Sequence, residues 1–303
     1  MESRTYYSQG KLMICGEYAV LKGATAFVLP TKAGQSLRVT EQVSSHPGID
    51  WVSFDPSGNI WFQAVLSLPD LLITETTDHG IAIQLVRFLM NAKSLNKEFL
   101  KPNKYYRIET QLEFEPDEGL GSSSTLTANI AKWAEINPYQ LHFASFKGSG
   151  FDVAAGMIGK PILYTMNGDH PMVEEVVWKK NFFDQLYFVH LNRKQISRQS
   201  IASSNIDLNQ AQIGQISRIS RLICANDDYF EFCLLLELIE NEISLGLGRP
   251  TIKQELFQDF HGTVKSLGAW GGDYVLATGT DTIEYFKSKG YNRIIPFKEM
   301  ISE

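Results

Sequence analysis

The sequence predicts a mixed α and β fold, because segments with strand periodicity and segments with helix periodicity alternate along all 303 residues. With 44% hydrophobic and 20% charged residues, the chain has the composition of an ordinary globular protein and is long enough for two domains with separate cores. It contains no internal repeat, low-complexity tract or proline-rich linker. We therefore expect a tight boundary near residues 165–180, with an N-terminal domain over residues 1–170 and a C-terminal domain over residues 171–303.

The N-terminal third is predicted to consist mainly of strands. Residues 6–42 contain β-rich runs separated by short turns, with the runs KLMICGE, TAFVLP and SLRVTE read as separate strands. Two further β-rich runs within residues 51–66 flank a Pro-Ser-Gly-Asn turn, which is typical of a hairpin. Residues 81–95 then have the apolar spacing of a helix.

A strand, a glycine turn and a helix follow in direct succession. Apolar and polar side chains alternate over residues 106–114, which is the pattern of a half-buried strand. Leu126, Ile130 and Trp133 fall at i, i+4 and i+7, so residues 122–136 are predicted to form an amphipathic helix. The turn between them reads PDEGLGSSS.

This turn, with Gly119, Leu120, Gly121, Ser122, Ser123 and Ser124, has the properties of an anion site. A helix start offers free N–H groups and the positive end of the helix dipole, and glycines let the backbone approach a ligand closely. Phosphate is the anion that we expect. The alternative is a structural turn whose helix is capped by serine. The turn is neither a Walker-type loop nor a complete dinucleotide fingerprint.

The second half of the chain continues the alternation of helices and strands. A glycine-rich approach, KGSGFDVAAGMIGKPILY, is predicted to lead into a helix and then into a strand that begins near Pro161. The further elements expected are helices over residues 208–225, 229–245, 251–260 and 283–289, and strands over residues 185–191 and 292–297. Between them lies a third glycine-rich segment, SLGAWGGDYV.

Charge and composition exclude several classes of partner. A formal net charge of −6 argues against nucleic acid or an anionic membrane as the main partner. The N-terminal segment lacks the basic region and the apolar core of a signal peptide, and no apolar run is long enough to span a membrane. Three cysteines without metal-ligand spacing (Cys15, Cys224 and Cys233) suit core thiols in a reducing cytoplasm. We expect a cytoplasmic protein, monomeric or homodimeric.

Three glycine-containing segments, GKLMICGEYAV, PDEGLGSSS and SLGAWGGDYV, resemble in order and spacing the signature motifs of the GHMP kinases, which include galacto-, homoserine, mevalonate and phosphomevalonate kinases. The segment around Asp152 is similar to the corresponding stretch of the mevalonate and phosphomevalonate kinases. The resemblance implies an α+β, two-lobed fold. Its N-terminal lobe is ribosomal S5 domain 2-like and its C-terminal lobe is ferredoxin-like.

The resemblance also implies ATP and Mg²⁺ as cofactors and a small-molecule acceptor. The turn from Gly119 to Ser124 would hold the ATP phosphates, and Ser123 would be a Mg²⁺ ligand, as suits a hard hydroxyl oxygen. Asp152 matches the catalytic aspartate, the general base toward the acceptor hydroxyl. Lys11 matches the lysine that pairs with it. Taken alone, Asp152 is equally compatible with a helix cap, and Lys11 with a solvated strand lysine.

Further residues are candidates on the substrate side. Glu17 would face the metal or cap the following turn. The third glycine segment, with Gly268, Gly271 and Gly272, would close over the site. A cluster after the strand at 185–191 contains Lys194, Ser197 and Arg198, which would bind a carboxylate or phosphate; its alternative is a solvated basic helix start.

Three departures from the family pattern keep alternatives open. No acid lies within residues 139–147, where the mevalonate kinase branch has a metal-binding glutamate; Trp270 replaces a small residue; and the turn before Gly119 is one residue short. The expected acceptor is mevalonate or phosphomevalonate. Alternatives are a kinase for a sugar or homoserine, a diphosphomevalonate decarboxylase-like enzyme, an inactive nucleotide-binding module and a dinucleotide-dependent oxidoreductase.

Overall fold

The computed structural model describes residues 2–168, 170–192, 206–268, 270 and 272–302. The chain forms two compact units, each assembled from several segments. Unit 1 comprises Met1–Gly10, Ala33–Pro116 and Gly121–Met157, and unit 2 comprises Lys11–Lys32, Asp117–Leu120 and Ile158–Glu303. A division into residues 1–170 and 171–303 stays a prediction.

Unit 1 is built on a mixed sheet with the strand order β5, β4, β3, β6, β2, and β1 also pairs with β2. Strands β3 and β6 run parallel, whereas β2–β6, β3–β4 and β4–β5 are antiparallel. The strands are β1 (Glu2–Cys15), β2 (Ala26–Val43), β3 (Gly48–Phe54), β4 (Ile60–Ser67), β5 (Ile73–Thr76) and β6 (Lys104–Leu112). The chain of β1 and β2 continues into unit 2.

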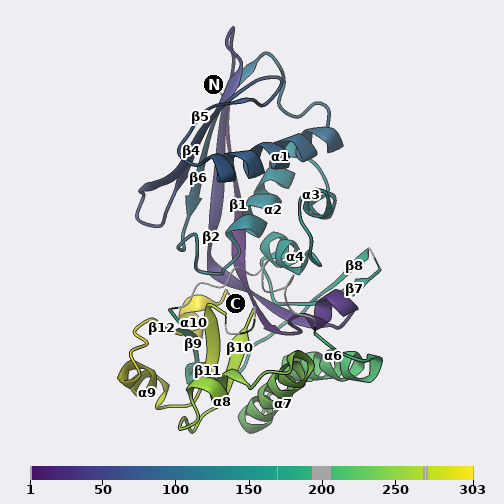
Figure 1. Ribbon diagram of the computed structural model, residues 1–303, viewed down its shortest axis with the longest axis vertical. Helices are drawn as coiled ribbons and strands as arrows, with labels where there is room; N and C mark the ends of the chain where they lie inside the picture. Colours follow the sequence, from purple (N-terminus) through teal and green to yellow (C-terminus); the bar gives the residue numbers. More distant parts are fainter. Residues whose placement is uncertain (1, 169, 193–205, 269, 271, 303) are drawn as a thin grey trace. The chain divides into compact units, whose positions relative to one another are not determined.

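Three helices of unit 1 pack on one face of this sheet (Figure 1). Alternate strand residues such as Trp51 and Ile108 point into a common core, where they meet Leu89 of α1, Ile130 of α2 and Leu141 of α3, all of them buried. This is why the strand and helix periodicities of the sequence predict these elements. The helices are α1 (His79–Leu95), α2 (Ser122–Ala134), α3 (Pro138–Ser145) and α4 (Phe151–Ile158).

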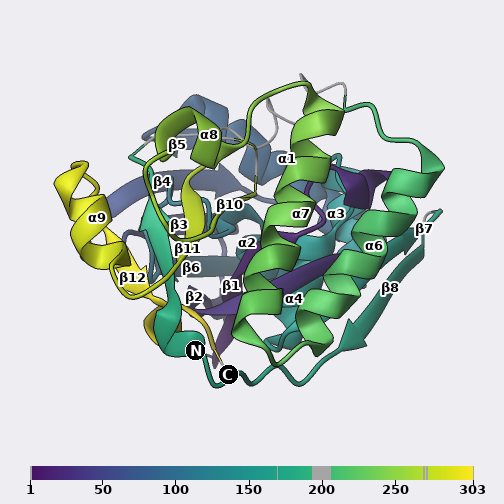
Figure 2. The ribbon, with the colours of Figure 1, turned by 90° about the horizontal axis from the view of Figure 1, so that it is seen from below.

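Unit 2 contains a four-stranded antiparallel sheet in the order β10, β11, β9, β12, and a hairpin of β7 and β8 whose first strand pairs with the first residues of β2. Helices α6 and α7 lie side by side (Figure 2). The strands are β7 (Ile162–Asn167), β8 (His170–Glu175), β9 (Leu186–His190), β10 (Val264–Leu267), β11 (Tyr274–Thr278) and β12 (Ile294–Pro296). The helices are η1 (Ala19–Lys22), η2 (Phe183–Gln185), α6 (Gln210–Ala225), α7 (Tyr229–Leu247), α8 (Ile252–Leu256), α9 (Thr282–Ser288) and α10 (Phe297–Met300).

Aromatic side chains fill much of the core of unit 2. The indole ring of Trp178 lies 5.0 Å from the ring of Phe27, 5.1 Å from that of Phe183 and 5.4 Å from that of Phe297, measured between centroids. A second cluster, which includes Phe257 and Phe286, packs against strands of the small sheet. Large buried rings dominate core energetics, so these clusters give unit 2 its own hydrophobic core.

Most of the predicted elements are confirmed, with one informative error in β2. The runs TAFVLP and SLRVTE, predicted as separate strands, form a single strand through Pro30. Residues 26–28 pair with β7 and residues 35–43 with β6, so Pro30 lies between these two ladders. Strand β8 and helix α10 are additional to the prediction.

Two further expectations concern the membrane and the cysteines. Within the described ranges, no helix combines the length and apolar character that a membrane span requires. All three cysteines are free thiols: Cys15 and Cys224 are buried and Cys233 is partly exposed. Burial raises the pKa of the Cys15 thiol to about 12, so this cysteine is an inert core residue.

Candidate functional site

The start of α2 has no side-chain cap among the described residues, as the predicted anion site requires. Gly119 and Gly121 have positive φ values of 76° and 98°, which glycine adopts without steric cost. Gly121 is the N-cap of α2, and within the described part of the chain no side chain caps this helix. By contrast, α1, α3, α6 and α7 each begin at an Asp or Asn whose side chain accepts an N–H group of the first turn. The first N–H groups of α2 are therefore left for a ligand.

The three serines of this turn have different environments. Ser124 is only 3% exposed, and its hydroxyl donates to the carbonyl oxygen of Gly121 at 2.9 Å. Ser122 is half-buried, and its Oγ lies 3.4 Å from the carbonyl oxygen of Pro116. Ser123 is exposed. The alternative in which a serine caps the helix is therefore wrong, and Ser123 is the serine whose hydroxyl faces solvent.

In unit 2, strand β1 holds the glycine turn through Lys11. The Nζ of Lys11 donates to the carbonyl oxygen of Gly119 at 3.0 Å, and its backbone N–H donates to the carbonyl oxygen of Leu120 at 3.0 Å. Asp273 packs against the same glycine, because a Cβ atom at position 119 would lie 2.1 Å from Asp273 Oδ2. Both the positive φ and this close approach require glycine at position 119.

Glu118, the residue before this glycine, is buried at 2% exposure. Its Oε1 accepts hydrogen bonds from the hydroxyl of Tyr274 and from Nη2 of Arg293. Burial and the bond to Glu118 raise the pKa of Tyr274, so the phenol stays a donor. The sequence reasoning missed Glu118, Asp273 and Tyr274, although all three lie within the quoted glycine segments.

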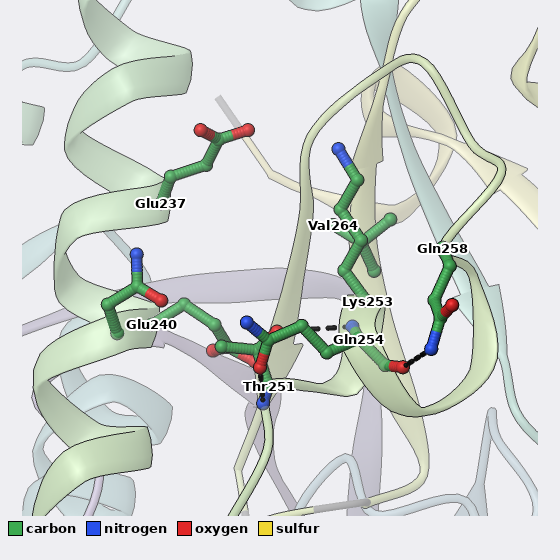
Figure 3. Close-up of a pocket in the computed structure, with 8 residues that line it drawn as sticks. Glu237, Glu240, Thr251, Lys253, Gln254, Gln258 and Val264 are labelled. Atoms are coloured by element: carbon green, nitrogen blue, oxygen red, sulfur yellow. Dashed lines mark hydrogen bonds between the residues drawn. The ribbon is translucent and has the colours of Figure 1, made fainter.

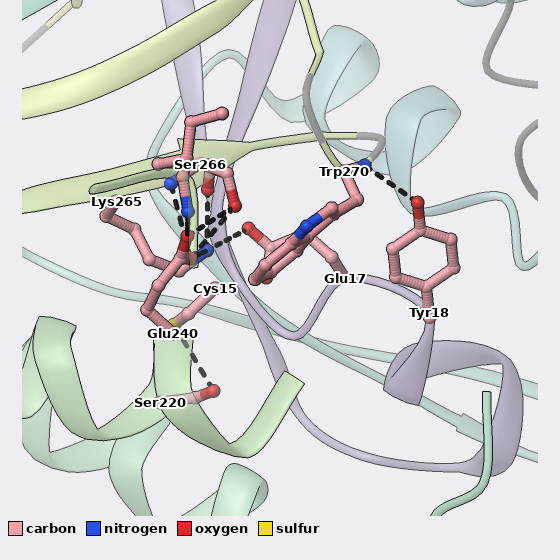
Figure 4. Close-up of polar contacts among 9 residues, drawn as sticks. Cys15, Glu17, Tyr18, Ser220, Glu240, Lys265, Ser266 and Trp270 are labelled. Carbon is pink, nitrogen blue, oxygen red and sulfur yellow. Dashed lines mark hydrogen bonds and ion pairs between the residues drawn. The ribbon is translucent and has the colours of Figure 1, made fainter. Parts of the chain in front are cut away.

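Glu17 belongs to a buried ionic cluster of unit 2 (Figure 4). Lys265 has no exposed surface, and its Nζ lies 2.7 Å from Glu17 Oε1 and 3.1 Å from Glu240 Oε2. The hydroxyl of Ser266 donates to Glu240. Burial raises the pKa of Glu17 to about 7, although Lys265 opposes the shift. Neither role predicted for Glu17, facing a metal or capping a turn, describes this ion pair.

The third glycine segment is described in part. Gly268 has a φ of 72° with open space where a Cβ would stand, and Gly272 is buried. The backbone N–H of Trp270 donates to the hydroxyl of Tyr18 at 2.7 Å, and its indole, 6% exposed, lies alongside Glu17 (Figure 4). Four of the predicted substrate-side residues lie outside the described residues: Lys194, Ser197, Arg198 and Gly271.

Asp152 lies in unit 1, in the first turn of α4, and is half-buried. Its Oδ1 accepts the N–H of Val153 at 3.0 Å. Gly148 and Gly150, with φ values of 143° and 79°, precede it. The glycine-rich approach into a helix is confirmed, whereas the pairing of Asp152 with Lys11 stays a prediction.

A polar pocket of about 280 Å³ opens in unit 2 beside α7, α8 and β10 (Figure 3). Its charged groups are engaged within the protein: Lys253 donates to the carbonyl oxygen of Gly262 at 2.7 Å, and Glu237 accepts from Thr263 at 2.9 Å. None of the predicted site residues with a described position lines this pocket. Among the residues with described positions, no group of three or more His, Cys, Asp and Glu side chains could hold a metal ion.

No protein-family model and no curated protein matches the sequence. Solved structures do match over nearly the whole chain. The mevalonate kinase of Methanococcus jannaschii is 14% identical with a TM-score of 0.67, covering 97% of both chains. The phosphomevalonate kinase of Streptococcus pneumoniae, in complex with phosphomevalonate and AMPPNP, is 15% identical with a TM-score of 0.67, covering 95% of this chain and 96% of that one.

A kinase that acts on a different acceptor matches with the same TM-score. The galactokinase of Lactococcus lactis, complexed with galactose, is 13% identical with a TM-score of 0.67, covering 97% of this chain and 94% of that one. At such identities the likeness concerns the fold. The larger mixed sheet and the smaller second sheet confirm the predicted α+β class. The chain therefore has the two-domain fold of the GHMP kinases that its three glycine segments predict.

Proposed function

We propose that this protein is an ATP- and Mg²⁺-dependent kinase that transfers the γ-phosphoryl group to a small acidic isoprenoid precursor, mevalonate or phosphomevalonate. The observation that carries the proposal is the start of α2, where two glycines with positive φ precede a helix that no described side chain caps. The fold is shared with kinases of mevalonate, phosphomevalonate and galactose, and we propose that this helix start holds the ATP phosphates.

The residues of the turn suit a nucleotide phosphate chain. Gly119 and Gly121 supply the positive φ values of the turn, the N–H groups at the start of α2 point along the helix axis, and Lys11 adds a positive charge at the carbonyl of Gly119. Phosphoryl transfer depends chiefly on positioning and on such electrostatic stabilisation, because the transferred group carries most of the charge.

Ser123 is the residue we propose for Mg²⁺, since its hydroxyl is exposed and hydroxyl oxygen is a ligand that Mg²⁺ accepts. The described residues contain no carboxylate cluster, which suits an ion held largely by water and phosphate oxygens. When bound, Mg²⁺ would neutralise charge on the phosphates.

Asp152 is proposed as the general base and Lys11 as the cation that supports it. A half-buried carboxylate at a glycine-rich helix start can accept the proton of an acceptor hydroxyl. A base in this role contributes about 10²–10⁴-fold to the rate. The cations of Lys194 and Arg198 and the hydroxyl of Ser197 are proposed to bind the acidic group of the acceptor, with Gly268, Gly271 and Gly272 closing over it.

The acceptor is tested by measuring ADP release from MgATP with mevalonate, phosphomevalonate, homoserine and galactose in parallel. We expect turnover with one of the two isoprenoid acids. Turnover with galactose or homoserine alone would replace our acceptor with that of another kinase in the same fold, which the galactokinase match makes a specific second candidate. Release of CO₂ together with ADP from diphosphomevalonate would instead indicate a decarboxylase.

Two alternatives outside the kinase class differ from the kinase in what they bind or release. A dinucleotide-dependent oxidoreductase would bind NAD(P) and not ATP, and an inactive module would bind ATP without releasing ADP with any acceptor. Calorimetric titration with AMPPNP and with NADP separates the oxidoreductase from the kinase, and the ADP-release assay separates the inactive module from the kinase. We expect a cytoplasmic enzyme, monomeric or homodimeric.

A further inference from the structure

Glu118 connects the glycine turn to two residues that lie 156 and 175 positions further along the chain. Both partners, Tyr274 and Arg293, donate to the same carboxylate oxygen. We infer that Tyr274 and Arg293 are positioning residues of the nucleotide site: through Glu118 they fix the glycine turn that the proposed function assigns to the ATP phosphates. This inference rests on that proposed function.

Because Glu118 is buried, its hydrogen bonds with Tyr274 and Arg293 hold the turn in one conformation. Glu118 is 2% exposed and Tyr274 is 1% exposed, so the carboxylate is withdrawn from water and is stabilised by donors within the protein, among them Tyr274 and Arg293. A buried charge without partners is strongly unfavourable. Tyr274 and Arg293 therefore fix the position of the Glu118 carboxylate, and this in turn fixes the Glu118 backbone.

The two donors are themselves fixed by the small sheet of unit 2. Tyr274 begins β11 and pairs in register with His190 of β9. The N–H of His190 donates to the carbonyl oxygen of Arg293 at 3.0 Å, and the N–H of Leu191 donates to that of Asp273 at 2.8 Å. The end of β9 and the starts of β11 and β12 thus form one backbone platform that holds these two donors.

Gly119, the next residue in the chain, links the position of Glu118 to the proposed phosphate site. Gly119 follows Glu118 directly and is held by Lys11 and in contact with Asp273. Because the peptide unit is rigid, a shift of the Glu118 backbone moves the amide N–H and the Cα of Gly119. We expect loosening at Glu118 to lower nucleotide affinity, since preorganised donors bind an anion better than mobile ones.

A purely stabilising role is the competing explanation, and an exposed pair in the same unit offers a control for the loss of a tyrosine hydroxyl. Asp259, in the same unit, also accepts from a tyrosine and a cation: Tyr285 donates to Oδ1 at 2.6 Å and Lys289 to Oδ2 at 2.7 Å. Tyr285→Phe removes the same chemical contact as Tyr274→Phe but away from the glycine turn.

The first experiment needs no ligand. Hydrogen exchange is followed by mass spectrometry in wild type, Tyr274→Phe and Tyr285→Phe. We expect Tyr274→Phe to accelerate exchange at residues 117–121 at least about tenfold, as the loss of a hydrogen bond to a buried charge implies, and Tyr285→Phe to leave this segment unchanged. Equal exchange at 117–121 in Tyr274→Phe and wild type would overturn the inference.

The second experiment measures AMPPNP affinity in the presence of Mg²⁺ by calorimetry, together with thermal stability. We expect a dissociation constant about tenfold higher for Tyr274→Phe and for Arg293→Ala. Glu118→Gln, which keeps an acceptor for both donors, should lie closer to wild type. Lower thermal stability with unchanged AMPPNP affinity in both variants would overturn the positioning role. Absence of AMPPNP binding by wild type would overturn the proposed function, and the exchange rates would then decide alone whether the cluster holds the turn.

Discussion

The side chain of Lys11 donates to the carbonyl oxygen of Gly119 at 3.0 Å, which ties the first glycine segment of the sequence to the second. A hydrogen bond from an ammonium group is stronger than one between neutral groups. Lys11 is therefore a structural anchor of the glycine turn, whatever further role it has in the chemistry. Its removal should affect nucleotide binding directly.

Lys11→Ala is expected to raise the KM for ATP about tenfold or more. The change removes a charge-assisted bond worth about 1.5–3 kcal/mol and leaves the carbonyl of Gly119 without this donor. Steady-state kinetics over a range of ATP concentrations measures the effect.

The control for Lys11→Ala is Lys22→Ala. Lys22 makes the same kind of bond in the same unit, donating to the carbonyl oxygen of Ile206 at 2.8 Å. We expect its KM for ATP to match that of wild type. Similar increases of KM in the two variants would show that loss of stability, not of the turn anchor, is responsible.

Ser123→Ala is expected to raise the Mg²⁺ concentration for half-maximal activity more than any other single change in the turn. The Ser123 hydroxyl is exposed and the described residues hold no carboxylate cluster for the ion. Ser124→Ala is the matched change, since its buried hydroxyl is engaged by Gly121. It should lower thermal stability and leave the Mg²⁺ titration unchanged; the reverse ranking would remove Ser123 from the metal site.

The pH dependence of stability should report the buried carboxylate of Glu17. Its pKa of about 7 lies above its ordinary value of 4.5, so the folded state binds more protons than the unfolded state between these values. The stabilising contribution is complete below about pH 4.5 and is lost as the pH rises through about 7. The total loss is on the order of 3 kcal/mol, from about 1.4 kcal/mol per pKa unit.

Urea unfolding of wild type and Glu17→Gln at several pH values tests this. Glutamine stays uncharged, so the difference in unfolding free energy between the two proteins isolates Glu17 from other groups. Glu240 and Lys265 face the same cluster and are unchanged in both proteins. We expect the glutamine variant to gain relative stability from about pH 5 to about pH 8. Parallel profiles would show that Glu17 keeps an ordinary pKa.

The elements around the glycine turn could be predicted from the sequence because their signals are local. The alternation that ends at Phe114 and the helical spacing that begins at Ser122 lie within a few residues of the turn, and both elements are present. The same holds for the hairpin at β3 and β4 and for α6 and α7, whose apolar positions follow the period of their element.

What could not be predicted depends on contacts between distant parts of the chain. Glu118 reads as an ordinary turn residue until Tyr274 and Arg293 are found beside it. Glu17 and Lys265 are separated by 248 positions, and no local pattern indicates that they form an ion pair. Pro30 reads as a strand end, because only the tertiary pairing shows that it lies between two ladders.

Asp152→Asn tests the central claim most directly, by the rate at which the γ-phosphoryl group of ATP appears in the acceptor identified by the ADP-release screen. Asparagine keeps the size of the side chain and still offers an oxygen to the N–H of Val153, so the fold should persist. We predict a kcat lower by about 10²–10⁴-fold with AMPPNP affinity unchanged. Unchanged turnover in Asp152→Asn would contradict the account.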